Sequence, residues 1–221
     1  MITPSDRDYK QTKLIKTGAK KLSPLFRELA DWVAEQYRGV TVLNVYYDKI
    51  IPGKRPRLSI IFERDDDRQK FVTSPRGNYD PLAQAKVASK FIEMLADKPN
   101  SKFNTDGLFV IFCAFAPVAR VEANWKVTRA ELGQLQIDLD DPSIWLIRPS
   151  WDHVVFFFYT DAQLRTSEGS DIRTLCTAGY SKLLGQYDEF GYFREQPISV
   201  YFDSKENFDA KYQGNWFYYD R

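Results

Sequence analysis

The sequence has 221 residues, of which 43% are hydrophobic and 15% aromatic, and its 31 basic and 30 acidic side chains give a net charge of +1. This composition is typical of a folded globular protein and excludes a disordered chain. A charge so close to zero disfavours a protein whose overall field attracts nucleic acid or anionic membranes.

Residues 1–21 form a predicted flexible basic N-terminal arm. The segment is polar, holds six basic side chains and shows little apolar periodicity, so a mobile arm and a short, weakly held helix both fit. It lacks the apolar stretch of a secretory signal, and the longest apolar run, 108–119, is too short to cross a bilayer. We therefore expect a cytoplasmic protein without a membrane partner.

The sequence of residues 22–127 predicts a first half whose helices and strands follow in the order α-β-β-α-β-β. Ser23 followed by Pro24 begins the first helix, and Asp80 begins the second, because these residue types favour the N-cap and first helical positions. Strands are predicted where apolar residues run together or alternate. The predicted elements are a helix from 24, strands at 40–50 and 58–63, a helix from 81, and strands at 108–116 and 120–127.

Residues 128–221 predict a second half in the same order. The segment 153–162, HVVFFFYTDA, aligns with 57–66, RLSIIFERDD, since both are apolar strands that end at an acidic residue. The predicted elements are a helix from 129, strands at 143–148 and 153–160, a helix from 171, and a closing hairpin with strands at 197–202 and 212–219.

Two pairs of matching positions suggest an internal duplication. Asn-Trp pairs begin at Asn124 and Asn215, and helix-capping aspartates occur at Asp80 and Asp171, so both offsets are 91 residues. Chance resemblance between two ordinary segments is the alternative. The predicted fold class is α+β, with an internally duplicated α-β-β-α-β-β unit whose antiparallel sheets have helices packed on one face.

The sequence contains no recognisable catalytic, cofactor or metal motif. His153 is the only histidine, and the two cysteines, Cys113 and Cys176, lie in apolar stretches where buried free thiols are expected. Zinc spacing, phosphate-binding glycine loops and the G-x-S-x-G pattern are all missing. We therefore expect no catalytic residues, no cofactor, no metal and no enzymatic activity.

Clusters of carboxylates and aromatic rings are the candidate partner-binding residues. Acidic turns attract a basic partner, although such turns are often only solvated. Aromatic side chains in the predicted loop 187–193 suit interface anchors, although loop rings also fold back into cores. The candidates are Asp65, Asp66, Asp67, Asp138, Asp140, Asp141, Trp151, Tyr187, Phe190, Tyr192 and Phe193.

The C-terminal half resembles the YezG-like immunity proteins, which neutralise secreted bacterial nuclease toxins. The likeness lies in the central strand HVVFFFYTDAQ and in the closing segment PISVYFDSKENFDAKYQGNWFYYD, within residues 143–221. The chain departs from that family in being doubled and in not being acidic overall. The resemblance implies a binding protein that acts stoichiometrically on a toxin inside the cell that makes it.

These observations leave three hypotheses. The first is a non-catalytic intracellular protein-binding protein, most specifically an immunity protein for a cognate bacterial toxin. The alternative is a small-molecule-binding protein or enzyme with a pocket between the halves, lined by rings such as Trp125, Trp216 and Tyr218. The third, binding of nucleic acid by the basic arm, is disfavoured by the net charge.

Overall fold

The computed structural model describes residues 2–51, 53–74, 77–96, 98 and 102–220, and the chain folds as two compact units. Unit 1 comprises residues 1–118 and unit 2 residues 119–221. The predicted boundary at 127 is therefore displaced. The chain passes from one unit to the next inside a single helix, α5 (Phe115–Lys126).

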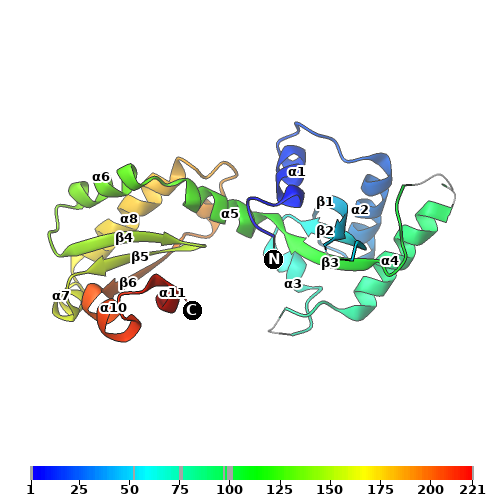
Figure 1. Ribbon diagram of the computed structural model, residues 1–221. Helices are drawn as coiled ribbons and strands as arrows, with labels where there is room; N and C mark the ends of the chain where they lie inside the picture. Colours follow the sequence, from blue (N-terminus) through cyan, green and yellow to red (C-terminus); the bar gives the residue numbers. More distant parts are fainter. Residues whose placement is uncertain (1, 52, 75–76, 97, 99–101, 221) are drawn as a thin grey trace. The chain divides into compact units, whose positions relative to one another are not determined.

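Unit 1 contains a three-stranded sheet with helices on both faces. The strand order is β1-β2-β3, in which β2 pairs antiparallel with β1 and parallel with β3. Helices α2 and α4 form the core on one face with Val45 and Phe112, among others. The elements are α1 (Arg7–Lys16), α2 (Pro24–Gln36), β1 (Val42–Ile50), β2 (Arg55–Phe62), α3 (Asp65–Gln69), α4 (Pro81–Ala96) and β3 (Phe109–Ala114) (Figure 1).

Helix α1 covers the other face of this sheet. Asn44 lies next to Val45 in β1, so its side chain points to the opposite face, where its Nδ2 donates to Thr12 Oγ1 of α1 at 2.9 Å. Tyr9 of α1 has no exposed surface and stacks on Phe115 at 5.2 Å. Of the two alternatives for the basic arm, the short helix is the one that forms over 7–16, and it buries side chains against the sheet.

Unit 2 repeats the arrangement of strands and also has helices on both faces of its sheet. The order is β4-β5-β6, with β5 antiparallel to β4 and parallel to β6. Helices α6 and α8 pack on one face, and α10 and α11 on the other (Figure 1). The elements are α6 (Arg129–Leu139), β4 (Ile144–Ser150), β5 (His153–Phe158), α7 (Asp161–Thr166), α8 (Asp171–Gly185), α9 (Tyr192–Glu195), β6 (Ser199–Ser204), α10 (Lys205–Tyr212) and α11 (Trp216–Tyr219).

The strand registers of the two units match position by position. β2 pairs with β3 from Arg57↔Phe109 onward, and β5 pairs with β6 from His153↔Ser199 onward, each over six consecutive residues. The antiparallel pairs are interrupted near the same point, between Val42 and Asn44 in β1 and between Ile144 and Leu146 in β4. The α+β class and the alignment of 57–62 with 153–158 are confirmed. The predicted antiparallel sheets with helices on one face are not found, because each sheet contains one parallel pair and has helices on both faces. An evolutionary duplication remains a hypothesis.

The fourth strand predicted for each half is helical. Residues 120–127 fall largely in α5, where Val121 and Asn124 are buried at helical spacing. Asn215 accepts a hydrogen bond from the backbone N–H of Phe217 and caps α11, so the predicted closing hairpin does not form. The third strand of each unit instead returns beside the central strand after a helical crossover, which makes that pair parallel.

Candidate functional site

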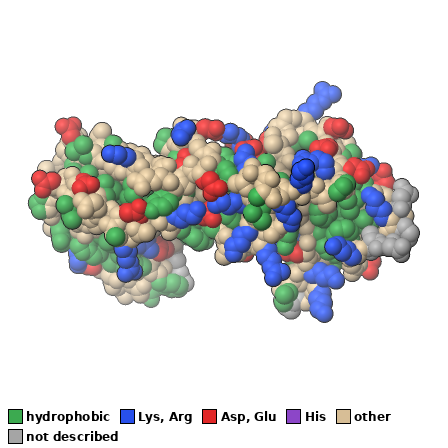
Figure 2. Space-filling model, turned by 90° about the horizontal axis from the view of Figure 1, so that it is seen from above, with side chains coloured by type: hydrophobic (Ala, Val, Ile, Leu, Met, Phe, Trp, Pro, Cys, Tyr) green, Lys and Arg blue, Asp and Glu red, His purple; other side chains and the backbone are tan. Residues whose placement is uncertain are grey.

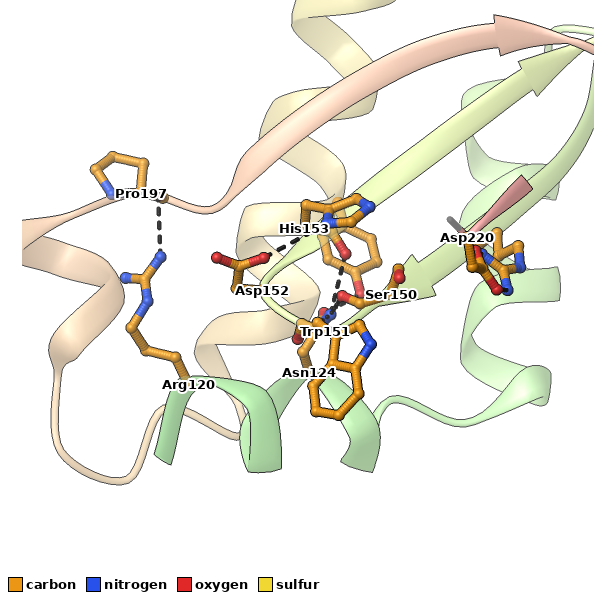
Figure 3. Close-up of polar contacts among 10 residues, drawn as sticks. Arg120, Asn124, Ser150, Trp151, Asp152, His153, Pro197 and Asp220 are labelled. Carbon is orange, nitrogen blue, oxygen red and sulfur yellow. Dashed lines mark hydrogen bonds and ion pairs between the residues drawn. The ribbon is translucent and has the colours of Figure 1, made fainter. Parts of the chain in front are cut away.

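A buried asparagine fixes the turn between β4 and β5. Asn124 of α5 is fully buried, and its Nδ2 lies 2.7 Å from the carbonyl oxygen of Ser150, 3.2 Å from that of Trp151 and 3.1 Å from that of His153. Its Oδ1 accepts from the Tyr180 hydroxyl of α8 at 2.6 Å. A buried amide without partners would destabilise the fold, so this set of bonds holds the turn against α5 and α8 (Figure 3).

Two half-exposed tryptophans lie next to this asparagine. Trp125 follows Asn124 in α5, Trp151 occupies the fixed turn, and their ring centroids are 5.5 Å apart with the planes tilted by 55°. Each is 50% exposed. Because Asn124 holds both backbone segments, the pair is arranged before any partner arrives, which lowers the entropy lost on binding. We call Trp125 and Trp151 the tryptophan pair.

The nearby cation Arg120 is engaged within unit 2. Its guanidinium donates to the backbone carbonyl oxygens of Tyr192, Gln196 and Pro197 and lies 4.3 Å from the ring centroid of Phe193. Burial lowers the pKa of Arg120, and the carboxylates of Asp152 and Asp188 partly oppose that shift. Arg120 therefore ties the segment before β6 to α5.

Asp152 and His153 complete the polar border of the tryptophan pair. Asp152 is largely exposed, and its Oδ1 lies 3.4 Å from Nδ1 of His153 (Figure 3). The His153 ring also meets Tyr201 edge to face at 5.3 Å. Among the described residues, no three His, Cys, Asp or Glu side chains are grouped to hold a metal ion. An aromatic pair beside an acid suits recognition of a protein surface.

The predicted acidic residues of α3 lie in unit 1 and have different environments. Asp67 is buried and accepts from the backbone N–H of Thr41 at 2.9 Å and from Lys70 at 3.1 Å. Burial alone would raise the pKa of Asp65, but hydrogen bonds from Arg68 and Gln69 lower it overall. Asp66 is exposed. Asp67 is thus a structural anchor for the start of β1.

The second acidic group lies at the end of α6, before β4 begins. Asp138 accepts from Gln134, and Asp141 accepts from the backbone and hydroxyl of Ser143. Asp140 ends α6 with a left-handed φ of 48°. This group and Trp151 therefore flank opposite ends of β4.

The aromatic segment 187–193 folds back onto unit 2. Tyr192 is 6% exposed, and Phe193 packs beneath Arg120. Tyr187 donates its hydroxyl to Glu131 at 2.6 Å, while Phe190 lies 5.8 Å from the Tyr192 ring. Replacing Tyr192 with alanine would therefore disturb the core of unit 2, so a loss of binding in that variant would not show that Tyr192 contacts a partner.

Sequence reasoning identified Trp151 but missed its neighbour and the residue that holds it. Trp125 was assigned to a predicted pocket with Trp216, whereas Trp216 stacks on Phe208 at 4.0 Å in the layer formed by α10 and α11. Asn124 was used only as a mark of duplication. The feature of the sequence that could have indicated the site is Trp151-Asp152 in a tight turn, because a large ring in a short turn between two strands tends to stay on the surface.

The two units have opposite charge. Counted along the sequence, unit 1 has 20 basic and 14 acidic residues, and unit 2 has 11 basic and 16 acidic residues, so their net charges are +6 and −5. The total of +1 therefore hides two fields of opposite sign. The tryptophan pair belongs to the acidic unit.

Comparisons with protein-family models, with curated proteins and with solved structures find no match to this chain. The YezG-like resemblance thus stays a prediction. In the part of the chain that the structure describes, no helix has both the length and the apolar character needed to cross a membrane.

Proposed function

We propose that the protein is a non-catalytic binding protein that holds a basic protein partner on the tryptophan pair of unit 2. The observation that carries the proposal is the pair itself: two half-exposed rings, 5.5 Å apart, on backbone that Asn124 fixes. Tryptophan is the residue type most enriched among energetically dominant interface positions, and a fixed pair loses little conformational entropy on binding.

Charge supports a basic partner. Unit 2 has a net charge of −5, and Asp152 lies beside Trp151 with its carboxylate largely exposed. An acidic border speeds the encounter with a basic surface and disfavours acidic competitors. The exposed Asp138 and Asp140 add to the same field from the other end of β4.

The sharper form of the proposal is that the partner is a toxin and that the protein confers immunity in the cytoplasm. This form comes from the resemblance of residues 143–221 to the YezG-like proteins. An inhibitor of this kind would cover roughly 1,600 Å² in total at a standard interface. The tryptophan pair would then be its central anchor, with the acidic residues at the rim.

The test is affinity purification from lysate of the cells that encode the protein, using wild type, a Trp125→Ala, Trp151→Ala variant and a Tyr159→Ala control. Tyr159 is also an exposed aromatic of unit 2 but follows β5 at the end opposite to Trp151. We expect one stoichiometric protein with wild type and the control, and at least a tenfold loss with the tryptophan variant. Equal retention by all three contradicts the proposal.

The immunity form has its own test. The captured partner is expressed in a cell that lacks the protein, with and without each variant, and growth is measured. We expect the partner to stop growth, wild type and Tyr159→Ala to restore it, and the tryptophan variant to fail. A harmless partner rejects the immunity form and leaves the binding function standing.

A further inference from the structure

A strap in unit 1 passes along the outer edge of its sheet. Helix α1 covers one face of the sheet and α2 the other, so residues 17–23, which join the two helices, must round an edge. They round it at β1, because residues 20–23 and residues 44–47 of β1 line the same groove. Among the described residues, no backbone hydrogen bond joins this strap to β1. We call the space of about 610 Å³ the strap groove, and its volume is that of a small-molecule site.

The floor of the strap groove is buried and its walls are aromatic. Asn44 and Val45 are only 2% and 1% exposed, so the surface that a ligand would meet belongs to other residues. Phe26, Tyr47 and Phe103 line the groove and are half-buried. The Phe103 ring lies 5.5 Å from the Phe26 ring and 5.0 Å from the Tyr47 ring, measured between centroids. Neighbouring rings of this kind favour the packing of a further aromatic ring against them.

Most of the uncharged polar side chains of the groove already have hydrogen-bond partners. Gln11 accepts from a lysine of the strap, Ser23 caps the first turn of α2, and Asn44 donates to α1. The Tyr47 hydroxyl bonds to the backbone of Asn104. A sugar or a nucleobase needs several hydrogen-bond partners when it is buried, so these contacts favour an apolar ring system instead.

The charged residues of the groove are all basic. Among the described lining residues, Lys20, Lys21 and Lys102 carry charge and no carboxylate is present. The three side chains are exposed, and none of them forms an ion pair with a described residue. Figure 2 views unit 1 from the side of α1 and the strap, where Lys and Arg side chains lie beside hydrophobic ones. The groove therefore combines apolar walls with a basic rim that no described carboxylate neutralises.

We propose that the strap groove binds a small aromatic anion, with the ring system of the ligand on the aromatic walls and its acidic group at the three lysines. In a small-molecule site, apolar walls bury most of the ligand and a few polar or charged groups fix its orientation. The +6 charge of unit 1 favours the approach of an anion. The described lining of the groove belongs entirely to unit 1, and its ligand differs in class and in charge from the basic partner of the tryptophan pair.

The first experiment locates the site with anilinonaphthalenesulfonate, an aromatic anion whose fluorescence rises in apolar surroundings. We expect the full-length protein to bind it saturably at one site per chain. Ile15→Trp places a large side chain in the groove and should weaken binding at least tenfold. Leu14→Trp places the same side chain on the preceding, exposed residue of α1, which does not line the groove, and should bind as wild type does. No saturable binding, or equal binding by the two variants, overturns the proposal.

A second experiment tests the chemistry of the ligand by displacing the same probe with naphthoate, with neutral naphthylmethanol and with decanoate. We expect naphthoate to compete at a concentration at least tenfold lower than naphthylmethanol. Each exposed ion pair adds little by itself, so all three lysines are changed together. The variant Lys20→Gln, Lys21→Gln, Lys102→Gln should lose the preference for the anion. The control Lys10→Gln, Lys54→Gln, Lys86→Gln removes the same charge from exposed lysines of unit 1 outside the groove and should keep it.

Three results of the displacement experiment overturn the proposal. Equal competition by naphthoate and naphthylmethanol would show that the groove does not select an anion. Retention of the preference in the variant of the three groove lysines would place the anionic group elsewhere. Competition by decanoate at a tenfold lower concentration than naphthoate would make a chain amphiphile the ligand in place of an aromatic one. Capture of a protein through the tryptophan pair is measured separately, so either idea can fail alone.

Discussion

The two sheets have corresponding strands but differ on one face. The first face of each sheet is the one covered by α2 and α4 in unit 1 and by α6 and α8 in unit 2, and the second face is the opposite one. In unit 1 this face holds buried polar groups beside apolar ones such as Ile61 and Ile111. Ser59 Oγ is buried with no hydrogen-bond partner among the described residues, and Asn44 and Asp8 are 2% and 3% exposed. In unit 2 the same face carries Trp145 and Phe157 under α10 and α11. Ser59 lies between Tyr46 and Ile111, as Val155 lies between Arg148 and Tyr201, so Ser59 and Val155 are equivalent.

The first faces of the two sheets are both apolar, and this shared property explains why both units keep the same strand order. The central strand presents Leu58, Ile60 and Phe62 to the core in unit 1 and Val154, Phe156 and Phe158 in unit 2. Burial of this apolar face against two helices is the main stabilisation of each sheet. The second face could therefore change its chemistry while the strand order persisted, and the aromatic layer of unit 2 belongs to that changed side.

The largest loss of stability is expected when a buried ring is removed from the aromatic layer of unit 2. Phe208 of α10 is buried and stacks on Trp216 at 4.0 Å. Phe208→Ala should cost about 3 to 5 kcal/mol of unfolding free energy, because it leaves a cavity beneath α10 and α11. Urea unfolding followed by circular dichroism measures the loss. Phe217→Ala removes an exposed ring of α11 and should change stability by less than about 0.5 kcal/mol; similar losses in both variants would show that the layer is not a packed core.

A smaller change in unfolding free energy is expected at the equivalent positions Ser59 and Val155, and its sign should differ between the two units. Ser59→Ala removes a buried hydroxyl that has no hydrogen-bond partner in the described part of the chain and should stabilise the protein by about 1 kcal/mol. Val155→Ser places such a hydroxyl in the aromatic layer and should destabilise it by about 2 kcal/mol. Thermal unfolding of the two variants checks both signs. If Ser59→Ala is destabilising, the second face of unit 1 is better satisfied than its contacts indicate.

Sequence reasoning predicted the class, the central strands and the main helices, because those depend on local apolar periodicity and on caps such as Ser23. It failed where the same residue pattern fits both a strand and a helix. In 120–127 the alternation of Val121, Ala123 and Trp125 suits a strand, yet burial of Val121 and Asn124 follows the helical period. Which pattern applies is decided by contacts with residues far along the chain, and these are not visible in a local window.

The candidate site was harder to predict for the same reason. Trp151 in a tight turn could be anticipated as a partner-binding residue, but its neighbour Trp125 comes from a separate element and meets it where Asn124 holds the turn. The charge of each unit was hidden in the total, where +6 and −5 nearly cancel, although the predicted boundary at 127 already divides the chain into parts of +7 and −6. Burial of Tyr192 likewise depends on where the segment before β6 folds back.

The smallest expected effect is a pH dependence confined to the second face of unit 1. Burial raises the pKa of Asp8 above its ordinary 3.8, and a hydrogen bond from the Tyr9 N–H and the charge of Arg57 only partly oppose this. The folded protein therefore binds this proton more tightly than the unfolded chain, so Asp8 favours folding at low pH and that contribution is lost as pH rises through its folded-state pKa. Asp8→Asn should be more stable than wild type at neutral pH, with the difference shrinking toward acid. Urea unfolding at several pH values from 4 to 7 measures it, with the exposed Asp66→Asn as the control for removing a charge from unit 1. Parallel pH profiles for Asp8→Asn and wild type would mean that Asp8 is solvated, and the second face of unit 1 would then be an open polar surface.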